Sequence, residues 1–213
     1  MFFKNLFTTK ARIKGDIGYY NLQDWWFQEF TEEERKEIED TYKPMGAESS
    51  RPLTQPNIDW SSQSVTGFLS MLAGWFNNPR QRELANRIMA KAAEAAQHHQ
   101  DDILDIHFLY SEMIPLYYPQ RDKEGMLGKV IEACRKQIAI APQAAKAFLK
   151  EYPDQDLPSH RGYEQLVIIL DKQGKQQEAI ALCQQAKHQK WAGDWDKRIG
   201  RYMEKSKRLK NKP

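Results

Sequence analysis

Apolar residues recur at three- and four-residue spacing along almost the whole chain, which is the period of an amphipathic helix. β-Branched residues do not alternate with polar residues over any long stretch, and no Asn-Gly or Asp-Gly hairpin turn occurs. The pattern therefore predicts an all-α protein. Beyond residue 60 it predicts helices at 62–77, 79–97, 101–118, 122–141, 143–151, 160–173, 175–189 and 194–209.

The N-terminal part follows a different pattern. Residues 1–20 predict an irregular arm, and apolar residues at helical spacing between 22 and 30 predict a short helix. Thr31 is followed by Glu34 three residues later, which is a capping box, because each side chain can accept from a backbone N–H at the start of a helix. The second helix should therefore begin at Thr31 and stop near Pro44.

Residues 44–59 contain three prolines together with glycine and serine, which is typical of a linker or an ordered loop. We therefore expect two domains. Residues 1–59 would form an N-terminal arm with two short helices and this loop, and residues 60–213 would form a helical-repeat domain.

The clearest repeat lies near the C-terminus. One helix carries an apolar stripe, Gly174 follows it, and small residues form the stripe of the next helix. The small residues would let the two helices approach closely. The stripe residues are Tyr163, Leu166, Val167, Leu170, Ala179, Cys183 and Ala186. This pattern resembles a tetratricopeptide repeat, a helix–turn–helix unit of about 34 residues.

Two upstream stretches fit the same template less completely. From Thr66 all seven template positions are apolar, and from Ser111 five of them are, whereas Arg121 and Gln137 depart from it. The resemblance implies antiparallel helical hairpins stacked as a short right-handed solenoid, and an irregular helical bundle is the alternative. The fitting residues are Leu69, Leu72, Ala73, Phe76, Ala85, Met89 and Ala92, then Ile114, Tyr117, Tyr118, Val130 and Cys134.

Three further segments of the chain carry a resemblance to known proteins. Residues 18–26, 157–166 and 191–199 are similar to uncharacterised bacterial tetratricopeptide-like proteins, a resemblance that brings a fold and no established activity. For tetratricopeptide proteins in general it implies that a concave groove binds a segment of an unidentified partner protein or peptide. The groove positions implied for this chain are Asn77, Glu112, Asp122, Arg161, Glu164, Ile168 and Asp171.

Composition and charge limit the possible classes of protein. The chain has 213 residues, a formal net charge of +3 and 29% charged residues, and its apolar runs are too short to span a membrane. The two cysteines fit a reduced, cytoplasmic setting.

The acidic residues concentrate in 15–60 and basic residues at both ends. The alternative function is therefore association with nucleic acid through the basic tail at 205–212. The acidic block could instead bind that tail.

Sites of chemistry are weak in this sequence. No glycine-rich phosphate loop, serine-hydrolase motif or His-Glu-x-x-His motif occurs, and Cys134 and Cys183 fall at packing positions. The best metal candidate is the His- and Asp-rich stretch at 98–107, for which a helix end with an Asp cap is the simpler interpretation. We expect no cofactor and no enzyme activity, although a catalytic site between the N-terminal helices and the first hairpin is a third hypothesis. Trp191 and Trp195 should seal the open end of the solenoid.

Overall fold

The computed structural model describes residues 13–47, 49–55, 57–98 and 102–210. The chain divides into two compact units, Met1–Gln63 and Ser64–Pro213. The described residues form eleven α-helices and one short 3-10 helix, and apart from an isolated bridge between Ser159 and Ala192 they contain no β-structure. The prediction of an all-α protein is confirmed. Across the same residues, no helix is both long enough and apolar enough to cross a membrane.

The first unit contains three helices: α1 (Gly15–Tyr19), α2 (Gln23–Glu29) and α3 (Glu32–Thr41). The predicted capping box is present at the start of α3. The Glu34 N–H donates to the Thr31 hydroxyl over 3.2 Å, and the Thr31 N–H donates to the Glu34 carboxylate over 2.9 Å. Such a cap stabilises a helix by about 1 kcal/mol.

Helix α1 corrects the prediction of an irregular arm over 15–20, while residues 1–12 lie outside the described residues. The α1 backbone is hydrogen-bonded to residues far along the sequence. The Ile17 N–H donates to the Leu53 carbonyl over 3.0 Å, and the Asp16 N–H donates to the Pro52 carbonyl over 3.3 Å. Gly15 has a φ of 62°, and a Cβ there would lie 2.4 Å from the carbonyl carbon of Leu53. The loop that follows α3 therefore determines this helix.

All eight helices predicted for the second unit are present, with ends shifted by a few residues. The largest difference is at the start of the helix predicted at 79–97. Pro79 lies in a turn before that helix, in which the Asn78 side-chain oxygen accepts from the Arg80 and Gln81 N–H groups. The helices are α4 (Val65–Trp75), α5 (Arg82–His98), α6 (Ile103–Tyr117), α7 (Met126–Ala139), α8 (Ala141–Glu151), α9 (Arg161–Lys172), α10 (Gln176–His188) and α11 (Trp195–Lys210), with a 3-10 turn at Tyr118–Gln120 after α6.

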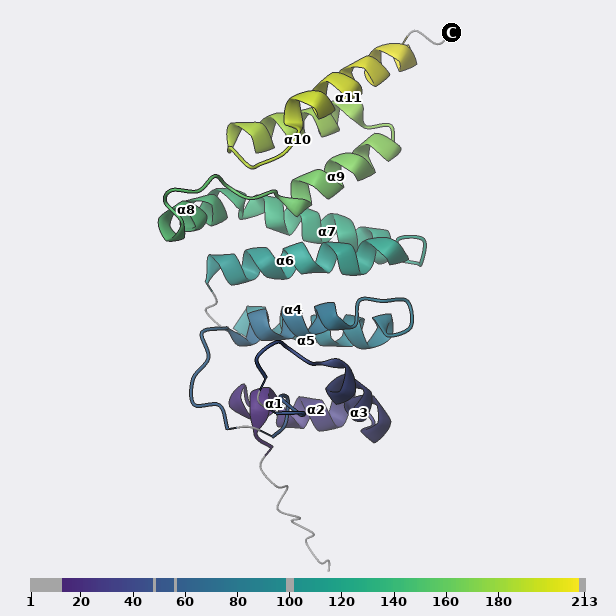
Figure 1. Ribbon diagram of the computed structural model, residues 1–213. Coiled ribbons are helices and arrows are strands. Elements are labelled where there is room, and N and C mark those ends of the chain that lie inside the picture. Colours follow the sequence, from purple (N-terminus) through teal and green to yellow (C-terminus); the bar gives the residue numbers. More distant parts are fainter. Residues whose placement is uncertain (1–12, 48, 56, 99–101, 211–213) are drawn as a thin grey trace, which may run out of the picture. The chain divides into compact units, whose positions relative to one another are not determined.

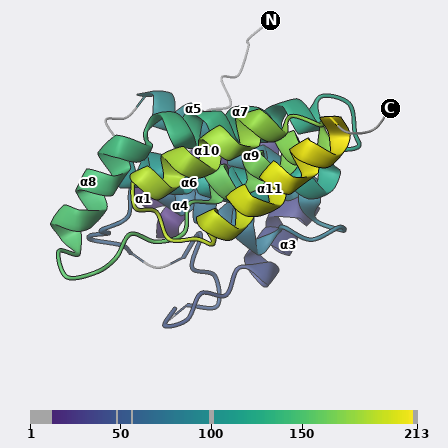
Figure 2. The ribbon, with the colours of Figure 1, turned by 90° about the horizontal axis from the view of Figure 1, so that it is seen from above.

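Consecutive helices of this unit pack as antiparallel pairs: α4 with α5, α6 with α7, and α9 with α10 (Figure 1). The first helices of the pairs also contact each other, since α4 packs against α6 and α6 against α9. Helix α11 packs on α10. Helix α8 contacts α6 and projects to one side of the other helices (Figure 2).

The predicted repeat positions form the core of this unit. Every apolar residue assigned to the first and last hairpins is buried, and so are four of the five assigned to the middle one. Tyr118 is the exception. Pro115 is accommodated within α6, which ends at Tyr117, so Tyr118 begins the 3-10 turn and its ring leaves the buried stripe.

Candidate functional site

Six of the seven predicted groove residues lie in or just after α4, α6 and α9, and five of them contact a neighbouring helix. The Asn77 side-chain amide, just after α4, donates to the Pro115 carbonyl of α6 over 3.3 Å. The Arg161 guanidinium at the start of α9 lies 3.5 Å from a Glu112 carboxylate oxygen of α6 and also donates to the Ser111 carbonyl. These contacts join the three hairpins on one face.

The next contacts connect α9 to α11. The Lys205 ammonium of α11 donates to the Asp171 carboxylate over 2.7 Å, and the carboxylate of Glu164 interacts with the guanidinium of Arg198. Ile168 is half-buried between these two positions on α9. Asp122 is exposed in the turn before α7. The structure therefore brings together five of the seven predicted groove residues as bridges between helices.

The order of the contacts gives the direction of the helices. Arg161 begins α9 and contacts Glu112 within α6, whereas Lys172 ends α9 and donates to the Tyr118 hydroxyl just beyond α6, over 3.0 Å. Helices α6 and α9 therefore run parallel to each other. The first helices of successive hairpins run in one direction, side by side.

A cluster around Tyr118 escaped the sequence analysis, which placed that ring in the core. The Lys172 ammonium lies 5.6 Å from the ring centroid and the Arg121 guanidinium 4.7 Å from it. The hydrogen bond from Lys172 lowers the pKa of the Tyr118 hydroxyl, and the charge of Arg121 adds to this effect. The proline after Tyr118 was the available signal, because it ends the helix.

The most buried polar cluster of the second unit lies where α6, α7, α8 and α9 meet. The Trp191 ring stacks on His107, with centroids 5.5 Å apart and planes 8° apart, and meets His160 edge-on at 4.6 Å. Phe148 of α8 contacts both His107 and Trp191. Trp191 therefore joins the second and third hairpins, and the prediction that it seals the end of the stack is wrong.

Gln137 connects this cluster to the backbone. The Gly162 N–H donates to its side-chain oxygen over 2.7 Å, so its amide nitrogen faces His107 and donates to that residue's carbonyl and to its Nε2. The proton of the His107 ring consequently lies on Nδ1, which has no hydrogen-bond partner among the described residues. A Cβ at Gly162 would lie 2.7 Å from the Gln137 oxygen and 3.0 Å from the Cys134 carbonyl oxygen, so a larger residue there would displace the Gln137 side chain.

Burial sets the charge state of both rings. It lowers the pKa of His107 to about 4. It also lowers the pKa of His160 to about 3, with repulsion from His107 as a second cause. Both histidines are therefore neutral near pH 7. As predicted, His160 begins its helix, where its Nδ1 accepts from the Tyr163 N–H over 3.3 Å.

Both cysteines lie at packing positions in the core, and Asp102 of the stretch at 98–107 caps a helix. Cys134 and Cys183 are buried, which raises their pKa values to about 12 and about 11 and keeps the thiols protonated. The Asp102 carboxylate caps α6 by accepting from the Leu104 N–H over 2.9 Å. Residues 99–101 of the histidine-rich stretch lie outside the described residues, and the residues that are described contain no group of three or more metal-binding side chains.

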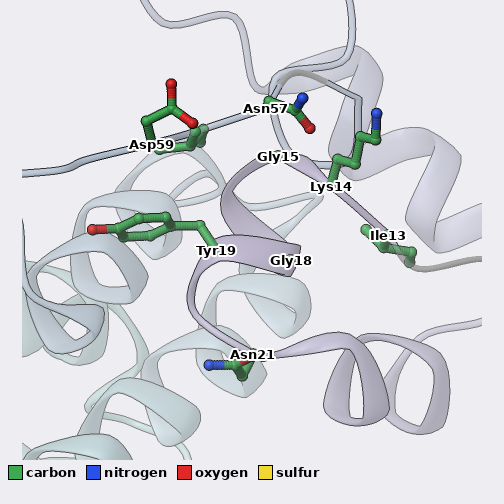
Figure 3. Close-up of a pocket in the computed structure, with 9 residues that line it drawn as sticks. Ile13, Lys14, Gly15, Gly18, Tyr19, Asn21, Asn57 and Asp59 are labelled. Carbon is green, nitrogen blue, oxygen red and sulfur yellow. The ribbon is translucent and has the colours of Figure 1, made fainter.

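A pocket of about 500 Å³ lies in the first unit beside α1. Its polar side chains, among them Lys14, Tyr19, Asn57 and Asp59, do not converge on one point (Figure 3). The Tyr19 hydroxyl already accepts from the Ser61 N–H over 3.1 Å. This pocket therefore offers no set of groups that would hold one ligand.

Comparison with known proteins yields no relative. No family model, no curated protein and no solved structure matches this chain. Function is therefore inferred from the contacts of the chain itself.

Proposed function

We propose that residues 64–213 form a tetratricopeptide-like, right-handed stack of hairpins that binds a segment of a partner protein along α4, α6 and α9, without catalysis. The parallel row of first helices carries this proposal. Each hairpin places one helix in the row and its second helix behind it, so the row is continuous over three hairpins. A continuous row of this kind is the binding surface of helical-repeat proteins.

The chemistry of the row favours a charged peptide. The side chains of Arg161 and Glu112 are 46% and 41% exposed, and an ion pair this exposed contributes about 0–1 kcal/mol to stability. A partner that offers its own charges can therefore replace such a pair at little cost. Tyr118, with Arg121 and Lys172 over its ring, adds an aromatic and cationic patch of the kind that dominates protein interfaces.

The alternative, nucleic-acid binding by the basic tail, has less support. Residues 205–210 continue α11, and Lys205 is paired with Asp171. Arg198, earlier in the same helix, is paired with Asp194. Internal ion pairs already occupy part of the positive charge that a phosphate backbone would require.

The proposal is tested by selecting from a displayed library of random peptides on the whole protein. A selected peptide is then titrated against Arg161→Gln/Lys172→Gln, and against Lys146→Gln/Lys150→Gln as the matched control on the exposed side of α8. We expect the first pair to weaken binding at least about tenfold and the control to leave it unchanged, because only the first pair lies on the row. Equal effects of the two pairs would refute the proposal.

A further inference from the structure

A cleft of about 470 Å³ lies in the second unit between α5, α6 and α7. Its volume falls within the roughly 300–1,000 Å³ of small-molecule sites. On α6 the lining residues recur every three or four positions from Ile106 to Tyr117, so they share one side of that helix. Ser111, Glu112 and Pro115, which contact the neighbouring helices of the row, lie on the opposite side of α6. The cleft is therefore separate from the surface proposed above to bind a partner.

The cleft is apolar apart from its rim. Leu109, Met113 and Ala133 line its base and are less than a tenth exposed. Four further lining residues are only half-buried, so their side chains are accessible to a molecule that enters: Ala93, Ala96, Ile106 and Tyr110. Because the two alanines of α5 are small, they leave space on that side. A ligand that covers this surface removes apolar area from water, which is favourable.

The dimensions of the cleft favour one extended chain. Its lining on α6 extends from residue 106 to residue 117, which is about 16 Å at the rise of an α-helix. The volume divided by this length gives a mean cross-section of about 29 Å². A helix, at least about 10 Å across, has a cross-section of about 80 Å² and would not fit inside. An extended alkyl chain is narrow enough to lie along the whole cleft.

The rim of the cleft carries one positive charge that is not neutralised. Lys129, Glu132 and Lys136 of α7 are exposed there. The Glu132 carboxylate pairs with the Lys136 ammonium over 2.7 Å. The Lys129 ammonium lies 5.9 Å from the centroid of the Tyr117 ring and forms no ion pair with any residue that the structure describes. A ligand with a single anionic group at this end of the cleft complements that charge.

We propose that the cleft binds a single-chain fatty acid. Its carboxylate pairs with the Lys129 ammonium beside Tyr117, where the lining of α6 ends. Its alkyl chain extends along α6 over Met113 toward Ile106, against the small side chains of α5. The apolar lining and the narrow cross-section account for the chain, and the unpaired lysine accounts for the carboxylate.

Isothermal titration of the whole protein tests this chemistry with dodecanoate, below the concentration at which it forms micelles. Butanoate keeps the carboxylate and lacks most of the chain, whereas dodecyltrimethylammonium keeps the chain and reverses the charge. We expect dodecanoate to bind at least about tenfold more tightly than butanoate, because it buries more methylene groups. It should bind at least about threefold more tightly than dodecyltrimethylammonium, because only the anion pairs with Lys129. No binding of dodecanoate at about 1 mM, or equal binding of either comparison compound, would overturn the proposal.

Variants locate the site. Ala96→Leu fills the space on the α5 side and should weaken dodecanoate binding at least about tenfold. Ala145→Leu, at a half-buried position on α8, is the matched control that should leave it unchanged. Because Ala96→Leu could also disturb the packing of α5, the exposed Lys129 supplies a second variant, Lys129→Gln, with Lys150→Gln on α8 as its control.

Lys129→Gln should weaken dodecanoate binding at least about threefold and leave the affinity for dodecyltrimethylammonium undiminished. Lys150→Gln should change neither affinity. An unchanged affinity for dodecanoate in either Ala96→Leu or Lys129→Gln would place the ligand elsewhere on the protein and overturn the proposal.

Discussion

The buried histidine pair makes a quantitative prediction for acid stability. His107 and His160 are neutral in the folded protein because burial lowers their pKa values to about 4 and about 3, from an ordinary value of 6.5. The unfolded chain therefore binds more protons than the folded chain below pH 6.5. The stability that these rings contribute is complete above pH 6.5 and is lost as the pH falls toward their folded pKa values.

The size of the effect follows from the shift. Each pH unit within this window costs 1.36 kcal/mol per histidine, so lowering the pH from 6.5 to 5 costs about 2 kcal/mol for each ring. Two rings together cost about 4 kcal/mol, which is a large part of the 5–15 kcal/mol that keeps a typical protein folded. Asp16 in the first unit acts in the opposite direction, because burial and the charge of Glu39 raise its pKa to about 6.

The assay compares urea unfolding at pH 7.5 and pH 5, followed by circular dichroism, in the wild type and in His107→Phe. Phenylalanine keeps a ring against Trp191 but cannot take up a proton. The variant should lose about 2 kcal/mol less than the wild type between the two pH values. Asp16 and the other acids contribute equally to both proteins and cancel in this comparison.

The matched control is His188→Gln, which removes an exposed histidine at the end of α10 and should leave the pH dependence unchanged. If His107→Phe loses as much stability as the wild type between pH 7.5 and pH 5, then the buried neutral ring is not the source of the acid sensitivity and our interpretation of the cluster is refuted.

Two other substitutions test the packing. Trp191→Ala should lower the free energy of unfolding of the second unit by about 3–5 kcal/mol, as measured by urea titration, because it removes the ring that joins α6, α8 and α9; a loss below about 1 kcal/mol would contradict this role. Gly15→Ala should speed amide exchange of α1–α3, since its Cβ would lie 2.4 Å from Leu53; exchange in residues 64–213 should stay unchanged, and equal acceleration there would contradict a local effect.

Local signals in the sequence were sufficient for most helices. The capping box at Thr31, the Asp102 cap and the glycine after α9 act within one turn, and the structure confirms each of them. Gly174 has a φ of 77°, which glycine adopts without strain. The small residues Ala179 and Ala186 are fully buried, in agreement with their predicted role in close packing.

What the sequence analysis missed depends on contacts between distant residues. Helix α1 is held by the backbone of Pro52 and Leu53, which no local pattern reveals. His107 is buried because Phe148 of α8 and Trp191 cover it, and the residue after Trp191 is bound to the loop before α9, where the Ala192 N–H donates to the Pro158 carbonyl.

The function proposed for the second unit is tested most directly by mapping where a selected peptide binds. Hydrogen–deuterium exchange of the whole protein is measured with and without the peptide. The peptide should slow exchange in α4, α6 and α9, and the protection should be strongest near Tyr118 and Arg161. Protection confined to α5, α7 and α10, or a library from which no peptide is enriched, would contradict the proposal that the parallel row of helices is the binding surface.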